Sequence, residues 1–166
     1  MVSVFDTRPC SLGEGPLWHP LRGELFWFDI NAHQLLSKTA VWQFDEYVSA
    51  AGWISHDELL IASESQLFRF HLGDHNQTKL CDLEANNPIT RSNDGRCDPQ
   101  GGFWIGTMGK KAEAKAGAIY RYYRGNLVQL FPEITIPNAI CFALDGHTAY
   151  FTDTPLRQIL AVDLDT

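Results

Sequence analysis

Three polar residues stand at the same place in a pattern that this chain repeats, and their oxygen atoms could hold a metal ion. Glu14 and Asn93 each lie six residues before a proline, and Asn93 and Asn138 each lie eight residues before a glycine. Carboxylate and amide oxygens are hard donors, which suit calcium, magnesium or manganese. Each residue alone fits a turn former equally well. The metal-site hypothesis therefore depends on the phase that the three residues share.

The elements that would position these residues are short strands. Four successive stretches share one layout, in which an apolar strand is followed by a turn rich in Asp, Gly, Pro or His and then by two further strands. No window shows a sustained period of 3.6 residues, so helices should be few. The expected strands are residues 14–20, 24–29, 34–37, 51–54, 58–62, 66–70, 93–99, 102–106, 118–122, 138–143, 148–153 and 158–162. Outermost strands are expected at residues 41–47, 78–82 and 127–131.

The spacing of the four copies predicts a β-propeller. The second strands are centred on Trp27, Ile61, Ile105 and Phe151, at steps of 34, 44 and 46 residues. Four-stranded propeller blades repeat at roughly 40–50 residues. A β-sandwich is the competing fold, but it would not repeat the same strand order in each copy. We therefore expect an all-β propeller with about four blades, and residues 1–166 as one partial domain truncated at its C-terminal end.

The innermost strands of a propeller line a central channel, so residues at one phase of the repeat should point to one axis. Glu14, Asn93 and Asn138 would meet there. The second copy offers only Ser49, Ala50, Ala51 and Gly52 at that place. The predicted site is therefore asymmetric.

Three stretches, in this order along the chain, carry a resemblance to a known family. The first is CSLGEGPLW (10–18), the second is RSNDGRCDP (91–99) followed by GTM (106–108), and the third is PNAI (137–140) with YFTDT (150–154). They resemble the motifs of the gluconolactonase, regucalcin (senescence marker protein) and luciferin-regenerating enzyme-like family, in its N-terminal portion. Three ordered motifs over nearly the whole chain make a specific match.

The resemblance implies a six-bladed propeller with one divalent cation (Ca, Zn, Mn or Mg) in the channel. Glu14 and Asn138 match two metal ligands of the family, and Arg91 and Asn93 match substrate-binding positions. A further ligand, the Asp of a later Pro-Asp-Gly motif, also serves as the proposed general base and is expected beyond Thr166. The 166 residues alone are therefore expected to be inactive and to fold poorly without the remainder.

Two departures from the family pattern concern the predicted site. Ala139 stands after the asparagine of the third motif, where Gly is usual. After the GTM stretch the family often has an acidic substrate contact, whereas Lys110 and Lys111 occupy that place here. Glu113 is the nearest carboxylate and is taken as the substrate-binding candidate. With Lys115, the two lysines are expected to form a solvated loop over the channel mouth, although a sugar-acid carboxylate is an alternative partner.

The chemistry implied by the resemblance is hydrolysis of a cyclic ester, a sugar-acid lactone, by a water molecule that the Asp beyond this chain deprotonates. A bound cation would polarise the carbonyl and stabilise the oxyanion, while Arg91 and Asn93 hold the sugar hydroxyls. Asp94 is expected to adjoin a turn and Asp153 to end a second strand, so neither should replace that base. The chain has no Gly-x-Ser-x-Gly nucleophile elbow.

Two other functions stay open at this point. One is a calcium-dependent phosphotriesterase on the same scaffold, and the other is a non-catalytic propeller that binds calcium or a protein. Arg91 favours a polyhydroxylated or acidic substrate over an organophosphate. A plain scaffold would not require Glu14, Asn93 and Asn138.

Composition and charge exclude several classes of partner. The net charge of -7 argues against nucleic acid and against an anionic membrane surface. The N-terminus lacks a basic start followed by a long apolar run, so no signal peptide is expected. The protein is expected to be cytoplasmic and to act on a small-molecule sugar lactone, without nucleic acid, membrane or an obligate protein partner.

Cysteines and histidines do not indicate a metal or redox motif. The cysteines are far apart, without a Cys-x-x-Cys pair, and are expected to be buried free thiols in a reducing compartment. The histidine spacing fits no zinc motif, so surface positions are expected. These residues are Cys10, Cys81, Cys97 and Cys141, and His19, His33, His56, His71, His75 and His147.

Overall fold

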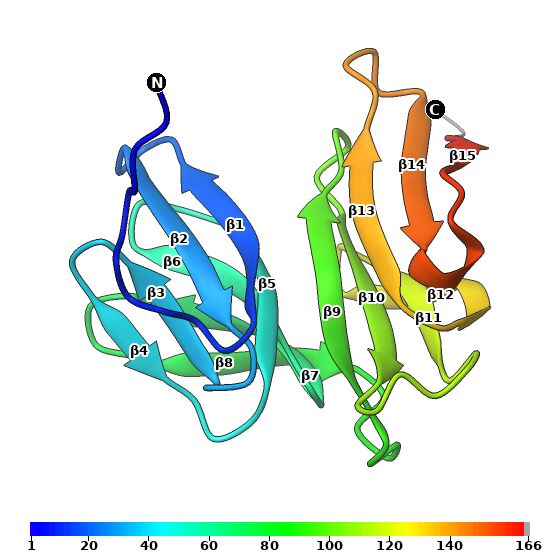
Figure 1. Ribbon diagram of the computed structural model, residues 1–166, viewed down its shortest axis with the longest axis horizontal. Coiled ribbons are helices and arrows are strands. Elements are labelled where there is room, and N and C mark those ends of the chain that lie inside the picture. Colours follow the sequence, from blue (N-terminus) through cyan, green and yellow to red (C-terminus); the bar gives the residue numbers. More distant parts are fainter. Residues whose placement is uncertain (165–166) are drawn as a thin grey trace.

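The computed structural model describes residues 1–164, and the last two residues of the expected domain, Asp165 and Thr166, lie outside that range. The strands form four antiparallel sheets, which follow one another along the chain as blades of a β-propeller (Figure 1). Within each sheet, consecutive strands pair with each other. The prediction of an all-β propeller with about four blades is confirmed.

The strand bounds agree closely with the repeat that the sequence predicts. Blade 1 contains β1 (Gly13–His19), β2 (Glu24–Asp29), β3 (Gln34–Ser37) and β4 (Val41–Gln43). Blade 2 contains β5 (Val48–Trp53), β6 (Glu58–Ser63), β7 (Gln66–His71) and β8 (Gln77–Asp82). Blade 3 contains β9 (Thr90–Cys97), β10 (Phe103–Gly109), β11 (Gly117–Tyr123) and β12 (Asn126–Ile134). Blade 4 contains β13 (Pro137–Phe142), β14 (Thr148–Asp153) and β15 (Leu160–Asp163).

The outermost strands were expected in three places and all three are present. The strand expected at residues 41–47 is shorter, as β4, and the one expected at 127–131 is longer, as β12. The helical content of residues 1–164 is a single 3-10 turn, η1 (Thr154–Leu156), with a proline in its first turn. Proline is suited to that place because its φ is already set and its missing N–H is not needed. Within the described residues, no helix is long and apolar enough to cross a membrane.

The hydrophobic core lies between consecutive blades. Phe26 and Phe28 stand two apart on β2, so they share one face of blade 1, and they are fully buried. They belong to one cluster with Phe68 and Phe70 of blade 2. Comparable clusters join blade 2 to blade 3 and blade 3 to blade 4. Because a buried phenylalanine contributes roughly 1.5–3 kcal/mol, these layers supply most of the stabilisation between blades.

The first strands β1, β5, β9 and β13 lie against one another and form the inner wall. A hollow of ≈ 280 Å³ is lined by residues of β1, β5 and β9. The innermost strands of three blades therefore do share one central space, as the repeat predicts.

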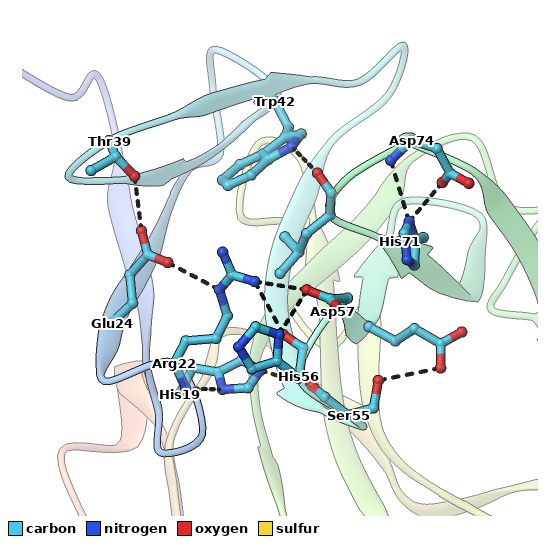
Figure 2. A network of polar contacts seen from close by, with 12 residues as sticks. His19, Arg22, Glu24, Thr39, Trp42, Ser55, His56, Asp57, His71 and Asp74 are labelled. Atoms are coloured by element: carbon cyan, nitrogen blue, oxygen red, sulfur yellow. Dashed lines mark hydrogen bonds and ion pairs between the residues drawn. The ribbon is translucent and has the colours of Figure 1, made fainter.

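At the far end of these strands, polar contacts join blade 1 to blade 2 (Figure 2). His19, which ends β1, donates from Nε2 to the backbone oxygen of Ser55 at 2.9 Å. Arg22 of the following turn donates to Glu24 at 3.2 Å and to Asp57 of blade 2 at 2.9 Å. These contacts lie at the opposite end of β1 from Glu14, so they hold the blades together without reaching the predicted site.

Two expectations about single residue types are wrong. His19 is fully buried rather than on the surface, because its ring lies between blades and meets the carbonyl of Ser55. The cysteines are free, as expected, but none is buried. Cys97 and Cys141 are exposed, and Cys10 and Cys81 are partly exposed.

Candidate active site

Blades 1 and 4 begin with the same local geometry, which places Glu14 and Asn138 at equivalent positions. Glu14 pairs with the penultimate residue of β2, and Asn138 pairs with the penultimate residue of β14. A bulge follows in both strands, and it contains Gly15 at φ 57° and Ala139 at φ 58°. A left-handed residue at this point bends the strand, so both side chains are presented at the same level of the inner wall. Ala139 adopts that conformation although it costs an alanine roughly 1–2 kcal/mol.

The glycine in blade 1 has a second role. A Cβ atom on Gly15 would lie 2.3 Å from the backbone oxygen of Ser49 in blade 2. Only glycine permits this approach of the two inner strands, and Glu14 stands directly beside it.

Asn93 joins blade 3 to blade 4 at the same level. Its Nδ2 donates to the Pro137 oxygen at 2.9 Å and to Asn138 Oδ1 at 3.3 Å. Its Oδ1 accepts from Arg91 Nη1 at 2.9 Å. The structure therefore brings Arg91, Asn93 and Asn138 into one hydrogen-bonded row across two blades.

Arg91 is held in the inner wall with part of its guanidinium open to a ligand. Its side chain is only 7% exposed, and its two hydrogen bonds both leave from Nη1, to the Ser92 oxygen and to Asn93. Burial lowers the pKa of Arg91, whereas Tyr47 and the charge of Glu14 act in the opposite direction. Glu14 therefore lies close enough for its charge to act on Arg91, and its own side chain is exposed.

The oxygen donors here fit a hard divalent cation. Asn138 Nδ2 donates to Thr154 Oγ1 at 3.0 Å, which turns Oδ1 toward Asn93. The exposed Glu14 carboxylate is an open oxygen donor. Asn138 Oδ1 accepts from Asn93 Nδ2 at 3.3 Å and retains one lone pair for a cation, whereas Asn93 Oδ1 accepts the shorter bond, at 2.9 Å, from Arg91. Two protein oxygens are fewer than the six to eight around calcium. Water or further residues would have to complete the coordination.

Blade 2 contributes no oxygen ligand at this level, as the sequence indicates. Ser49 precedes Trp53 by the same interval that separates Asn93 from Cys97 in blade 3. It is fully buried, and its Oγ donates to Ser92 Oγ at 2.7 Å. The Ser49 hydroxyl therefore bonds blade 2 to blade 3.

Glu113 is bound to its own loop. Its carboxylate accepts from the backbone N–H of Lys111 at 3.0 Å, and a Cβ on Gly109 would lie 2.1 Å from Oε2. The structure thus gives Glu113 a role in loop geometry and does not join it to the row of Arg91, Asn93 and Asn138.

Lys110 is exposed, as are Lys111 and Lys115, which agrees with the expected solvated loop. The Nζ of Lys110 also forms an ion pair with Glu64 of blade 2 and donates to the Pro88 oxygen at 2.9 Å. The loop is therefore bonded to blade 2 through this lysine.

Asp94 lies within β9, inside the strand expected at residues 93–99. Its carboxylate accepts from the Ile140 N–H of blade 4 at 2.7 Å.

A cluster of hydroxyl groups around Glu84 fixes the start of β9, and no pattern in the sequence predicts it. The carboxylate of Glu84 accepts from Thr90 at 2.5 Å, from Thr107 at 2.9 Å and from the phenol of Tyr120 at 2.7 Å. Burial and the Glu84 carboxylate raise the pKa of Tyr120, which therefore stays a hydrogen-bond donor. The cluster anchors the residue next to Arg91. Its members are too far apart in sequence to form a readable motif.

Comparisons with known proteins agree with this geometry. The chain matches the SMP-30/Gluconolactonase/LRE-like region over residues 12–166. A provisionally named sugar lactone lactonase of Rhizobium meliloti (strain 1021) is 43% identical over 162 residues, which are 93% of this chain and 54% of that protein. The L-arabinolactonase of Azospirillum brasilense is 34% identical, with 96% of this chain and 56% of that protein covered.

Solved structures show the same fold. A regucalcin from Agrobacterium tumefaciens strain C58, described as a calcium-binding protein, superposes with a TM-score of 0.94 at 42% identity, over 96% of this chain and 56% of that one. Luciferin-regenerating enzyme superposes with a TM-score of 0.87 at 21% identity, over 94% of this chain and 57% of that one. The chain thus spans about half the length of the relatives it matches. Because the family model matches residues 12–166 and relatives of more than 30% identity cover nearly the whole chain, the chain belongs to the SMP-30/gluconolactonase/LRE-like family.

Proposed function

We propose that the protein of which these residues form a part is a divalent-metal-dependent hydrolase that opens a sugar-acid lactone. The observation that carries the proposal is the inner-wall row itself, in which the exposed carboxylate of Glu14 and the amide oxygen of Asn138 stand at equivalent positions beside a buried guanidinium. Relatives named as lactonases support the same chemistry.

Each residue of the row would have a separate task. Glu14 and Asn138 would hold the cation through their open oxygens. When bound, the cation would polarise the lactone carbonyl and stabilise negative charge on its oxygen. Arg91 would direct its free nitrogens, Nε and Nη2, to oxygen atoms of the sugar. Asn93 would position both neighbours, because its amide is bonded to Arg91 on one side and to blade 4 on the other.

The proton of the attacking water needs a base, and the described residues offer no carboxylate free for that task in the row. Asp94 accepts a backbone N–H and lies on the strand next to Asn93, while Asp153 accepts the N–H groups of Thr135 and Ile136. We therefore propose that the base lies outside residues 1–164, as the family resemblance implies.

The test is hydrolysis of a panel of sugar lactones by the full-length protein, before and after chelation and after return of single divalent ions. Glu14→Gln should lower kcat/KM by about 100-fold or more, because losing a ligand removes several kcal/mol of transition-state stabilisation. Glu133→Gln is the matched control, since Glu133 is exposed and pairs only loosely with Lys115.

The outcomes separate the candidate functions. Metal-dependent turnover that Glu14→Gln abolishes and Glu133→Gln retains would support the lactonase. Calcium binding through Glu14 without turnover of any lactone would point to a binding propeller. Turnover of a phosphotriester in place of lactones would point to a phosphotriesterase. Lactone turnover that survives thorough chelation would contradict the metal dependence.

A further inference from the structure

Blade 2 supplies the inner wall with an aromatic ring in place of an oxygen ligand. Ser49 is fully buried and bonded to Ser92, so the blade 2 sector has no polar group at the level of Glu14. Tyr47 stands two residues earlier, as Arg91 stands two residues before Asn93. The guanidinium carbon of Arg91 lies 6.0 Å from the centre of the Tyr47 ring. Tyr47 is therefore the neighbour of Arg91 along the wall.

Side chains of blades 1 and 3 contact the ring of Tyr47, and its backbone is bonded within blade 2. The ring of His33, in blade 1, lies 4.4 Å away and meets it edge to face. The ammonium of Lys110, in blade 3, lies 5.8 Å from the ring centre and is itself fixed by Glu64. The backbone N–H of Glu64 donates to the backbone oxygen of Tyr47 at 2.8 Å, which fixes the backbone of blade 2 at this point.

These contacts do not bury Tyr47 fully. The residue is half-buried, although it also packs against the hydrophobic cluster between blades 1 and 2. A rigid aromatic ring that is partly open and adjoins a partly open arginine is a binding surface of low conformational cost. The cationic groups of Arg91 and Lys110 also attract the negative π face of the Tyr47 ring, which helps to fix the position of the ring.

We propose that Tyr47 is a specificity-determining residue whose ring packs against the C–H face of the sugar lactone, next to the hydroxyls that Arg91 binds. This inference rests on the proposed function. It adds that blade 2 contacts the substrate, and it names the face of the sugar ring that blade 2 contacts. The C–H groups of a sugar ring carry partial positive charge, so they pack on the negative face of an aromatic ring. The contact is remote from the ester and is made equally in the ground state and the transition state. It should therefore act on KM and leave kcat nearly unchanged.

The experiment compares Tyr47→Ala with Tyr47→Phe in the full-length protein, on the lactone that the wild type turns over best. Tyr47→Ala should raise KM about 10-fold and change kcat by less than about 3-fold. Tyr47→Phe should keep KM within about 2-fold of the wild type, because it keeps the ring. Tyr123→Ala is the matched control, since Tyr123 is also half-buried and has Arg121 and Arg124 at 4.6 and 5.0 Å from its ring.

Several outcomes would overturn the inference. Unchanged KM in Tyr47→Ala, or an equal loss in Tyr123→Ala, would exclude a specific contact. A loss confined to kcat would give Tyr47 another role, and an equal KM defect in Tyr47→Phe would assign the contact to the hydroxyl. Tyr47→Leu, which retains apolar volume, and calorimetric binding of the hydrolysed sugar acid separate a folding defect from a lost contact. A wild type that turns over no lactone would overturn the proposed function, and this inference with it.

Discussion

Arg91 occupies an unusual electrostatic position for a buried cation. Its side chain is almost fully buried, yet its hydrogen bonds go to a backbone oxygen and an amide rather than to a carboxylate. Glu14 influences it only through its charge. Burying a charge without a paired anion is costly, and arginine stays protonated in proteins. Such a group is retained where a ligand supplies the missing acceptors.

The shape of the guanidinium should matter as much as its charge. Arg91→Lys keeps the charge but loses the planar fork that bonds Asn93 and faces the ligand together. We expect kcat/KM for the preferred lactone to fall about 10- to 100-fold, with the melting temperature little changed. Steady-state kinetics and thermal unfolding check this. Arg124→Lys, on the exposed turn after β11, should leave both quantities unchanged, and equal effects in the two variants would contradict the argument.

At the scale of the elements, blades 1 and 4 share an aspartate at the end of the second strand, which holds the segment that leads into the inner strand. Asp29 accepts from the Ser11 and Leu12 N–H groups at 2.7 and 3.0 Å. Asp153 accepts from Thr135 and Ile136 at 3.1 and 2.8 Å. The segments that lead to Glu14 and Asn138 are thus fixed in the same way in blades 1 and 4.

The carboxylate of Asp29 should make stability depend on pH. Burial alone would raise its pKa, but the N–H groups of Leu12 and Ser11 outweigh burial and lower the pKa in the folded state. A lowered folded pKa gives stabilisation that is present above the unfolded value near 3.9 and is lost as pH falls through the folded value.

Asp29→Asn should therefore cost about 1–3 kcal/mol of unfolding free energy at pH 7, because two backbone donors lose a charged acceptor. The difference from the wild type should shrink as the pH falls below about 4, through the lowered pKa of Asp29 in the folded state. Denaturant unfolding at several pH values measures it. Asp45→Asn, at an exposed position, serves as the control, and a difference that is constant with pH would contradict the assignment.

The turn contacts between blades 1 and 2 also hold neighbouring elements together (Figure 2). His19→Ala should cost roughly 2–3 kcal/mol, because it opens a cavity at a fully buried side chain and leaves the Ser55 backbone oxygen without its donor. His56→Ala, in the same network but 61% exposed, should change stability by less than about 0.5 kcal/mol. Chemical denaturation distinguishes the two. Lactone turnover should survive in both variants, since these residues lie at the far end of β1 from Glu14.

At the scale of the whole molecule, the blades approach so closely that single glycines set their spacing. A Cβ on Gly106 of blade 3 would lie 2.4 Å from the Pro137 ring of blade 4. Pro137 precedes Asn138 and accepts a hydrogen bond from Asn93. The distance between blades 3 and 4 therefore also sets the geometry of the proposed site.

Gly106→Ala should destabilise the protein by about 1–3 kcal/mol through overpacking, and should weaken divalent-ion binding by displacing Asn138 from Asn93. Thermal unfolding and calorimetric ion titration measure the two effects. In Gly73→Ala the new Cβ would lie 3.3 Å from the partly exposed ring of His71, so little change is expected. Tight ion binding in Gly106→Ala would show that the spacing of the blades does not govern the site.

The sequence by itself was sufficient to predict the propeller architecture. It was also sufficient to name candidate site residues in three of the four blades. Strands of period two and blade-length spacing require little tertiary context, because each blade repeats the same local pattern of burial. For the same reason the sequence predicts that Glu14, Asn93 and Asn138 lie at one level. Glu14 and Asn138 have matching registers in their blades, and Asn93 donates a hydrogen bond to Asn138. Their functions stay predictions.

Only the tertiary structure decided which neighbours each side chain meets. Ser49 could have faced the channel, but blade 3 lies close enough for Ser92 to take its hydroxyl. Lys110 belongs to a loop of lysines in sequence, yet Glu64 of another blade lies beside it. Tyr47 carries no motif and becomes part of the inner wall through contacts with side chains of blades 1 and 3. Packing between blades joins residues that are far apart in the chain, and no local pattern encodes that proximity.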